Sequence, residues 1–129
     1  MRYSRFDALS AAVLVGAAVV GIALLPSLPD RIAVHFGAGG SPDDYLSATL
    51  GVVLVPAIGL VALAAVRGLV SLGNDVPAPP WFGLALAGFL AYVHGVVLAW
   101  NLGYRINVTL LVLPAVAVIV VLSFATRRT

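Results

Sequence analysis

Residues Ala8 to Leu25 read ALSAAVLVGAAVVGIALL, a stretch of 18 residues without a charged side chain. An α-helix rises about 1.5 Å per residue, so this stretch covers most of a bilayer core that is about 30 Å thick. Arg2 and Arg5 precede it, a layout that a cleaved signal peptide shares. Because the apolar stretch is long and no A-x-A-like site precedes Pro26, we expect a retained membrane anchor.

Three further apolar blocks follow, at residues 48–66, 81–100 and 106–124. Hydrophobic residues make up 62% of the 129-residue chain and charged residues 9%, which is more apolar surface than a soluble domain of this size could bury. The sequence therefore predicts a single-domain, all-α membrane protein, in which the proline-rich connector 74–80 divides four transmembrane helices into two hairpins. The expected helices are 8–25, 42–72, 81–100 and 106–124, and the expected loop between the first two is 26–41.

The start of the second helix is predicted from Ser41-Pro42-Asp43-Asp44. Serine is a common N-cap, proline suits the first helical position, and acidic residues favour the first turn. We therefore expect the second helix to begin at Pro42 and to protrude from the membrane. Pro56 and Pro114 lie inside the second and fourth apolar blocks, where each is expected to bend its helix.

Arginine placement predicts the orientation, because cytoplasmic segments retain positive charge. With both termini in the cytoplasm, five arginines lie inside and two lie outside, and the segment 26–47 is extracytoplasmic. This distribution is typical of a multi-pass protein of the cytoplasmic membrane. The inside set is Arg2, Arg5, Arg67, Arg127 and Arg128, and the outside set is Arg31 and Arg105.

Small residues predict which helices pack closely, because close backbone approach stabilises helix pairs in lipid. Two helices carry them at four-residue spacing, and the alternative is chance, since alanine and glycine are abundant in this chain. The first and third helices are therefore expected to contact each other, and a homo-oligomer is a further expectation. The residues are Ala8, Ala12 and Gly16 in the first helix and Gly83, Ala87, Ala91, Gly95 and Ala99 in the third.

The loop after the first helix has its own pattern. Ile32, Val34 and Phe36 alternate with smaller or polar residues, which is the period of a short strand or an extended surface segment with one apolar face. Glycines at 37, 39 and 40 then permit a sharp reversal. His35 falls on the polar side, where it can face Asp43 or Asp44.

The series Leu-Pro-Asp-Arg-Ile-x-Val-His-Phe, followed by Gly-x-x-Asp, resembles the N-terminal membrane domain of unknown function in the SdpI-type immunity protein family. The resemblance covers about residues 8–66, and Ala33 stands where that family usually has proline. It implies a membrane domain with the loop as its signature, and an immunity or resistance role. The matching positions are Leu28, Pro29, His35, Phe36, Gly40 and Asp43.

Composition and motifs exclude several functions. The chain has no cysteine, and neither a nucleophile elbow, a zinc-protease helix nor a phosphate-binding loop is present, so we expect no enzyme and no cofactor. Scattered arginines do not form a nucleic-acid surface. His35 could bind a metal with Asp30, Asp43 or Asp44, but one histidine in a glycine-rich loop favours a structural hydrogen bond.

His94 lies deep in the third block, where an ionisable side chain needs a protein or water partner. A neutral histidine bonded to a neighbouring helix is expected, with a proton relay as the alternative. Two functional hypotheses follow. The first is a loop that binds a peptide or membrane-protein partner, and the second is an oligomeric transporter or channel subunit with His94 near its path. The candidate loop residues are Pro29, Asp30, His35, Phe36, Gly40 and Asp43.

Overall fold

A computed structural model describes residues 5–73 and 79–126 of the chain. Within these ranges there are four α-helices, each long and apolar enough to cross a membrane, which indicates a multi-pass membrane protein as the apolar blocks predict. Most of the predicted connector 74–80 lies outside the described residues, as do Arg2, Arg127 and Arg128. The elements are α1 (Arg5–Leu24), the 3-10 turn η1 (Leu25–Ser27), β1 (Arg31–Phe36), β2 (Pro42–Ser47), α2 (Ala48–Ser71), α3 (Pro80–Asn101) and α4 (Val108–Thr126).

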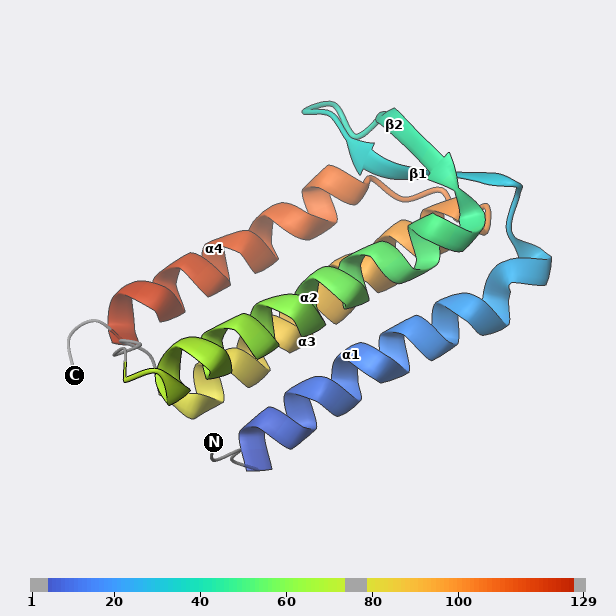
Figure 1. Cartoon of the computed structure of the whole chain (residues 1–129). Helices are drawn as coiled ribbons and strands as arrows, with labels where there is room; N and C mark the ends of the chain where they lie inside the picture. Colours follow the sequence, from blue (N-terminus) through green and yellow to red (C-terminus); the bar gives the residue numbers. More distant parts are fainter. Residues whose placement is uncertain (1–4, 74–78, 127–129) are drawn as a thin grey trace.

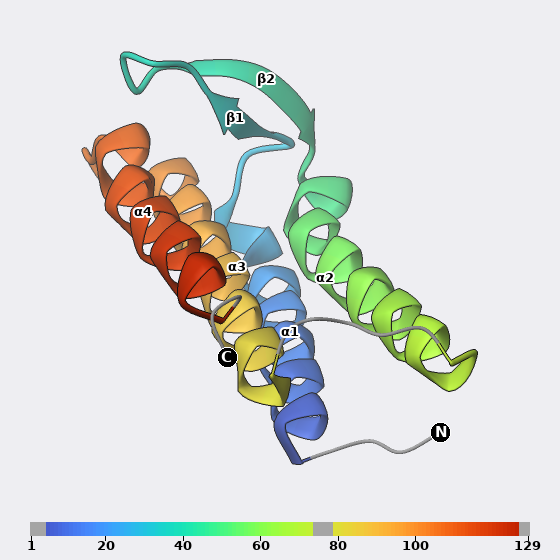
Figure 2. The ribbon, with the colours of Figure 1, turned by 90° about the vertical axis from the view of Figure 1, so that its left-hand side faces the viewer.

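The helices run alongside one another in alternating directions (Figures 1 and 2). The two strands and the α3–α4 turn lie together at what we call the hairpin end. At the opposite end α1 and α3 begin, and α2 and α4 end. Helix α1 packs against both α2 and α3, whereas α4 packs against α3.

The contact between α1 and α3 is the one that the sequence predicts, but the predicted small residues of α1 do not make it. Ala8, Ala12 and Gly16 are exposed, and a Cβ added at Gly16 or Gly95 would meet no atom within 4 Å. A different face of α1, with the three- and four-residue spacing of a packed helix, is turned inward. Its buried residues are Asp7, Ser10, Leu14 and Gly21.

The second helix begins six residues later than predicted, because residues 42–47 form strand β2. Its N-cap is Ser47, whose Oγ accepts a hydrogen bond from the Leu50 N–H at 3.4 Å. Proline is tolerated at the first position of a strand, so Pro42 suits β2 as well as it would suit a helix start. The expected helix start at Pro42 was therefore wrong, and the fold is mostly helical with a small two-stranded sheet rather than all-α.

Strands β1 and β2 pair antiparallel, with Ile32 opposite Leu46 and irregularities around His35. Ile32 is fully buried and packs with Ala48, Val52 and Leu98, which joins the hairpin to the ends of α2 and α3. A Cβ at Gly51 would collide with the Ile32 side chain, so glycine is what allows this close approach. The hairpin is thus an integral part of the helix bundle at this end.

Candidate functional site

The reversal between the two strands is built by Gly37, Gly40 and Ser41. The Gly37 N–H donates to the Ser41 carbonyl at 2.8 Å, and the Gly40 N–H donates to the Gly37 carbonyl at 3.0 Å. Gly40 has a φ of 89°, which favours glycine, and a Cβ there would collide with Asn107 at the start of α4. Gly40 therefore allows both the turn and its close approach to α4.

Asn101, the last residue of α3, holds strand β1 in place. Its Oδ1 accepts from the Ala33 N–H at 2.8 Å, while its Nδ2 donates to the Ala33 carbonyl at 2.9 Å. Nδ2 also donates to the carbonyl of Val97, within α3, at 2.8 Å. One side-chain amide thus satisfies both backbone groups of a fully buried strand residue.

Two further contacts seat the hairpin on α3 and α4. Thr109 Oγ1 donates to the Gly37 carbonyl at 2.7 Å. The Phe36 ring meets Trp100 edge to face, with 5.4 Å between ring centroids. Phe36 and Gly40, both candidate site residues, therefore help to position the hairpin.

His35 and Asp43 lie together on the outer surface of the hairpin. His35 Nδ1 is 2.6 Å from Asp43 Oδ1, and the two side chains are 70% and 53% exposed. The alternation in the loop left Asp43 and Asp44 as possible partners of His35, and the structure pairs it with Asp43. Among the described residues there is no group of three metal-ligating side chains, and the pair alone offers two ligands.

The remaining acidic and proline residues of the loop make other contacts, and Pro29 and Asp30 lie at the base of the hairpin, before β1. Pro29 and Asp30 are exposed, and the Asp30 carbonyl accepts a hydrogen bond from the Ala48 N–H at 2.8 Å. Asp44 Oδ1 accepts from the N–H of Tyr45 at 2.9 Å. Asp30 thus joins the first strand to the start of α2 through its backbone.

The backbone groups of Tyr45 in strand β2 are also bonded to side chains. Its N–H donates to Asp44, and its carbonyl accepts from Arg31 Nη2 at 3.2 Å. Together with the Asn101 bonds to Ala33, these contacts occupy polar backbone groups that an added strand would use. A strand added at Ala33 or Tyr45 would have to displace these bonds.

His94 is buried inside the bundle, 4% exposed, and its Nε2 lies 3.0 Å from the carbonyl of Ala17 in α1. Because a carbonyl only accepts, Nε2 is the donor. A bond from His94 to a neighbouring helix is what its depth in the third apolar block predicts. A Cβ at Gly21 would lie 2.8 Å from Val52 Cβ and 3.2 Å from His94 Nε2, so glycine there allows the close approach of α2 and leaves room for the ring.

A second buried polar contact, which the sequence did not predict, joins Asp7 of α1 to Arg67 of α2. Asp7 Oδ1 lies 2.9 Å from Arg67 Nη2 and accepts from Arg67 Nε at 3.0 Å. The two side chains are only 5% and 18% exposed. The sequence did contain a signal for this pair. Asp7 and Arg67 carry opposite charges and belong to consecutive helices, at ends that are expected on the same side of the membrane.

Comparison with known proteins gives one match. A family model described as a domain of unknown function (DUF1648) matches residues 12–60, which take in most of α1, the hairpin and the first half of α2. No curated protein matches the chain. No solved structure matches it either.

Proposed function

We propose that this chain is a small multi-pass membrane protein that binds a peptide or membrane-protein partner through its hairpin, in an immunity or resistance role. The observation that carries the proposal is the exposed His35–Asp43 pair on a hairpin held from beneath by Asn101 and Thr109. A surface fixed before binding loses little conformational entropy when a partner arrives. Such a surface is suited to recognition.

Stability alone does not account for this pair. An exposed ion pair contributes about 0–1 kcal/mol, and both side chains are more than half exposed. The attachment of the hairpin already comes from Ile32 in the core and from the Asn101 bonds. His35 and Asp43 therefore supply donor and acceptor groups on the surface, where a partner can reach them.

The motif supports the same proposal. Residues 12–60, which the family model matches, include the complete hairpin. The resemblance of this segment to the SdpI-type immunity proteins adds the expectation that the partner is a membrane-active peptide or another membrane protein. An immunity or resistance role of this kind requires binding and no catalysed reaction. One imidazole and one carboxylate are sufficient polar groups for such binding.

The proposed orientation places the hairpin outside the cytoplasm. Arg31 and Arg105 are at the hairpin end, whereas Arg5 and Arg67 are at the opposite end. Arg2, Arg127 and Arg128 belong to the sequence segments next to that opposite end and lie outside the described residues. The excess of arginine there favours a cytoplasmic location by the positive-inside rule.

The test is growth of cells expressing the wild type or a His35→Ala/Asp43→Ala variant during exposure to membrane-active peptides, with membrane levels matched. We expect protection by the wild type and its loss in the variant. Leu72→Ala is the control, because Leu72 is also exposed, at 80%, but lies at the opposite end. Equal growth of all three strains, or no protection by the wild type, would contradict the proposal.

A further inference from the structure

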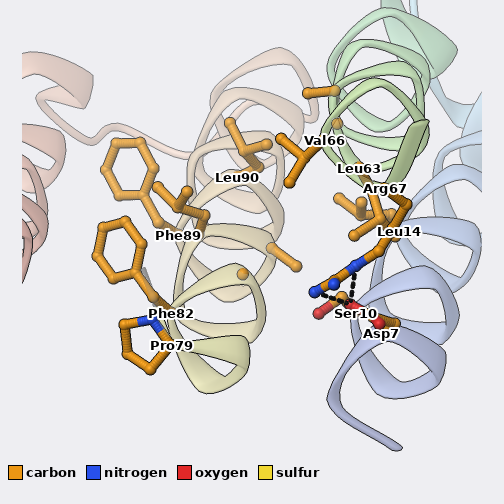
Figure 3. A pocket seen from close by; sticks show the side chains of 15 residues that line it. Asp7, Ser10, Leu14, Leu63, Val66, Arg67, Pro79, Phe82, Phe89 and Leu90 are labelled. Carbon is orange, nitrogen blue, oxygen red and sulfur yellow. Dashed lines mark hydrogen bonds and ion pairs between the residues drawn. The ribbon is translucent and has the colours of Figure 1, made fainter. Parts of the chain in front are cut away.

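A cavity of about 350 Å³ lies between α1, α2 and α3, toward the end opposite the hairpin (Figure 3). Its walls are apolar, with Leu14 from α1, Leu63 from α2, and Phe82 and Leu90 from α3. Asp7 and Arg67 are the only charged side chains among its lining residues in the described part of the chain. The cavity is therefore amphipathic, with long apolar walls and one charged end.

The surroundings of the cavity decide what can fill its apolar part. Nearly all of its lining residues belong to helical segments long and apolar enough to cross a membrane. Water is a poor occupant of an apolar cavity, because it needs two to four polar partners. Lipid acyl chains are the apolar material that surrounds such helices, so an acyl chain is the occupant of matching chemistry.

The charged end of the cavity determines which lipid headgroup would be bound together with the acyl chain. Asp7 engages Nε and Nη2 of Arg67, but a guanidinium carries five N–H donors and Arg67 also faces the cavity (Figure 3). Arg5 lies at the start of the same helix α1. Arg5 does not line the cavity, but among the described residues this end of the bundle carries two arginines and one aspartate. The excess charge around the mouth of the cavity is therefore positive, which is complementary to a phosphate.

We propose that this cavity binds one acyl chain of an anionic phospholipid whose phosphate accepts hydrogen bonds from Arg67. Asp7 fixes the guanidinium through Nε and Nη2, so the remaining donors are already oriented. The apolar walls contribute affinity for the chain, and Arg67 contributes preference for a negative headgroup. The site is separate from the hairpin, and its failure would leave the proposed function unaffected.

The test is native mass spectrometry of the full chain released from detergent micelles, with phosphatidylglycerol and phosphatidylcholine of identical acyl chains. Gly83→Leu adds side-chain volume to the cavity wall, because Gly83 lines the cavity and an added Cβ there meets no atom within 4 Å. Gly95→Leu is the matched control on the same helix, with equally open space and no place in the lining. Asp7→Asn/Arg67→Gln removes the charges while keeping groups that can hydrogen-bond each other.

We expect the wild type and Gly95→Leu to retain phosphatidylglycerol about tenfold better than phosphatidylcholine, the ratio that one charge-assisted hydrogen bond supplies. Gly83→Leu should lose both lipids, and Asp7→Asn/Arg67→Gln should lose the preference alone. Equal retention by Gly83→Leu and Gly95→Leu would overturn the proposal. So would a dimer that disappears only in Gly83→Leu, because a second copy of the chain would then occupy the cavity.

Discussion

The Asn101 side-chain amide bonds to both backbone polar groups of Ala33, at 2.8 Å to the N–H and 2.9 Å to the carbonyl. The two residues are 68 positions apart, and Ala33 is completely buried. Buried backbone groups need partners, and Asn101 supplies what a third strand would otherwise provide. This contact makes the orientation of the hairpin dependent on the end of α3.

Asn101→Leu is expected to destabilise the protein by about 2–6 kcal/mol, because two buried backbone groups lose their partners at about 1–3 kcal/mol each. Thr109→Val is the graded control, since it removes one hydrogen bond to Gly37 and should cost about 1 kcal/mol. The free energy of unfolding in mixed micelles measures both changes. Unaltered hydrogen exchange at the Ala33 amide in Asn101→Leu would show that the contact does not secure the strand.

Gly51→Ala should also destabilise the hairpin end, because the new Cβ would collide with the fully buried Ile32 side chain. Overpacking of a filled core typically costs about 1–3 kcal/mol. Gly88→Ala in α3 is the control, since a Cβ there meets no atom within 4 Å and alanine favours a helix. Unfolding of the two variants in the same micelles should give opposite signs, and equal stabilities would refute the close approach of Ile32.

The apolar blocks predicted the four helices because span length and hydrophobicity are local properties of the chain. The start of α2 was missed because Ser41 to Asp44 has the residues of a helix N-terminus, while pairing with β1 extends the chain and moves the cap to Ser47. Pairing is a tertiary effect, which the local signal does not contain.

Tertiary contacts between individual residues were predictable from the sequence only where the two partners lie close together in the chain. The alternation around His35 indicated that it could face Asp43 or Asp44, and pairing of the two strands brings it to Asp43. The supports from Asn101 and Thr109 were not predicted, since they depend on where distant helices end. Likewise, the small residues of α1 at four-residue spacing gave the correct helix pair and the wrong face.

The Asp7–Arg67 pair should show strong coupling in a double-mutant cycle. Arg67→Leu leaves the 5%-exposed Asp7 side chain without this partner, and breaking a buried pair costs about 3–5 kcal/mol. Asp7→Leu/Arg67→Leu should be less destabilised than the sum of the two single variants, because neither charge is then left alone. Unfolding in micelles measures all four proteins. Additive effects would mean that the two side chains do not stabilise each other.

His94→Leu should weaken the contact between α1 and α3 by about 1 kcal/mol, the usual size of a hydrogen bond between membrane helices. His94→Gln should recover part of the loss, since its amide can still donate to the Ala17 carbonyl. In liposomes neither variant should change ion flux, because His94 is expected to join two helices. A flux present with the wild type and absent with His94→Leu would instead favour the transporter or channel hypothesis.

Single cysteines test the orientation, because the natural chain contains none. Ala38→Cys places a thiol at the exposed hairpin turn, and Leu72→Cys places one at the opposite end, where Leu72 is 80% exposed. The arginine distribution predicts that a membrane-impermeant maleimide labels Ala38→Cys in intact cells and Leu72→Cys only after the membrane is opened. The reverse pattern would place His35 and Asp43 in the cytoplasm, and the hairpin could then not meet a peptide that arrives from outside.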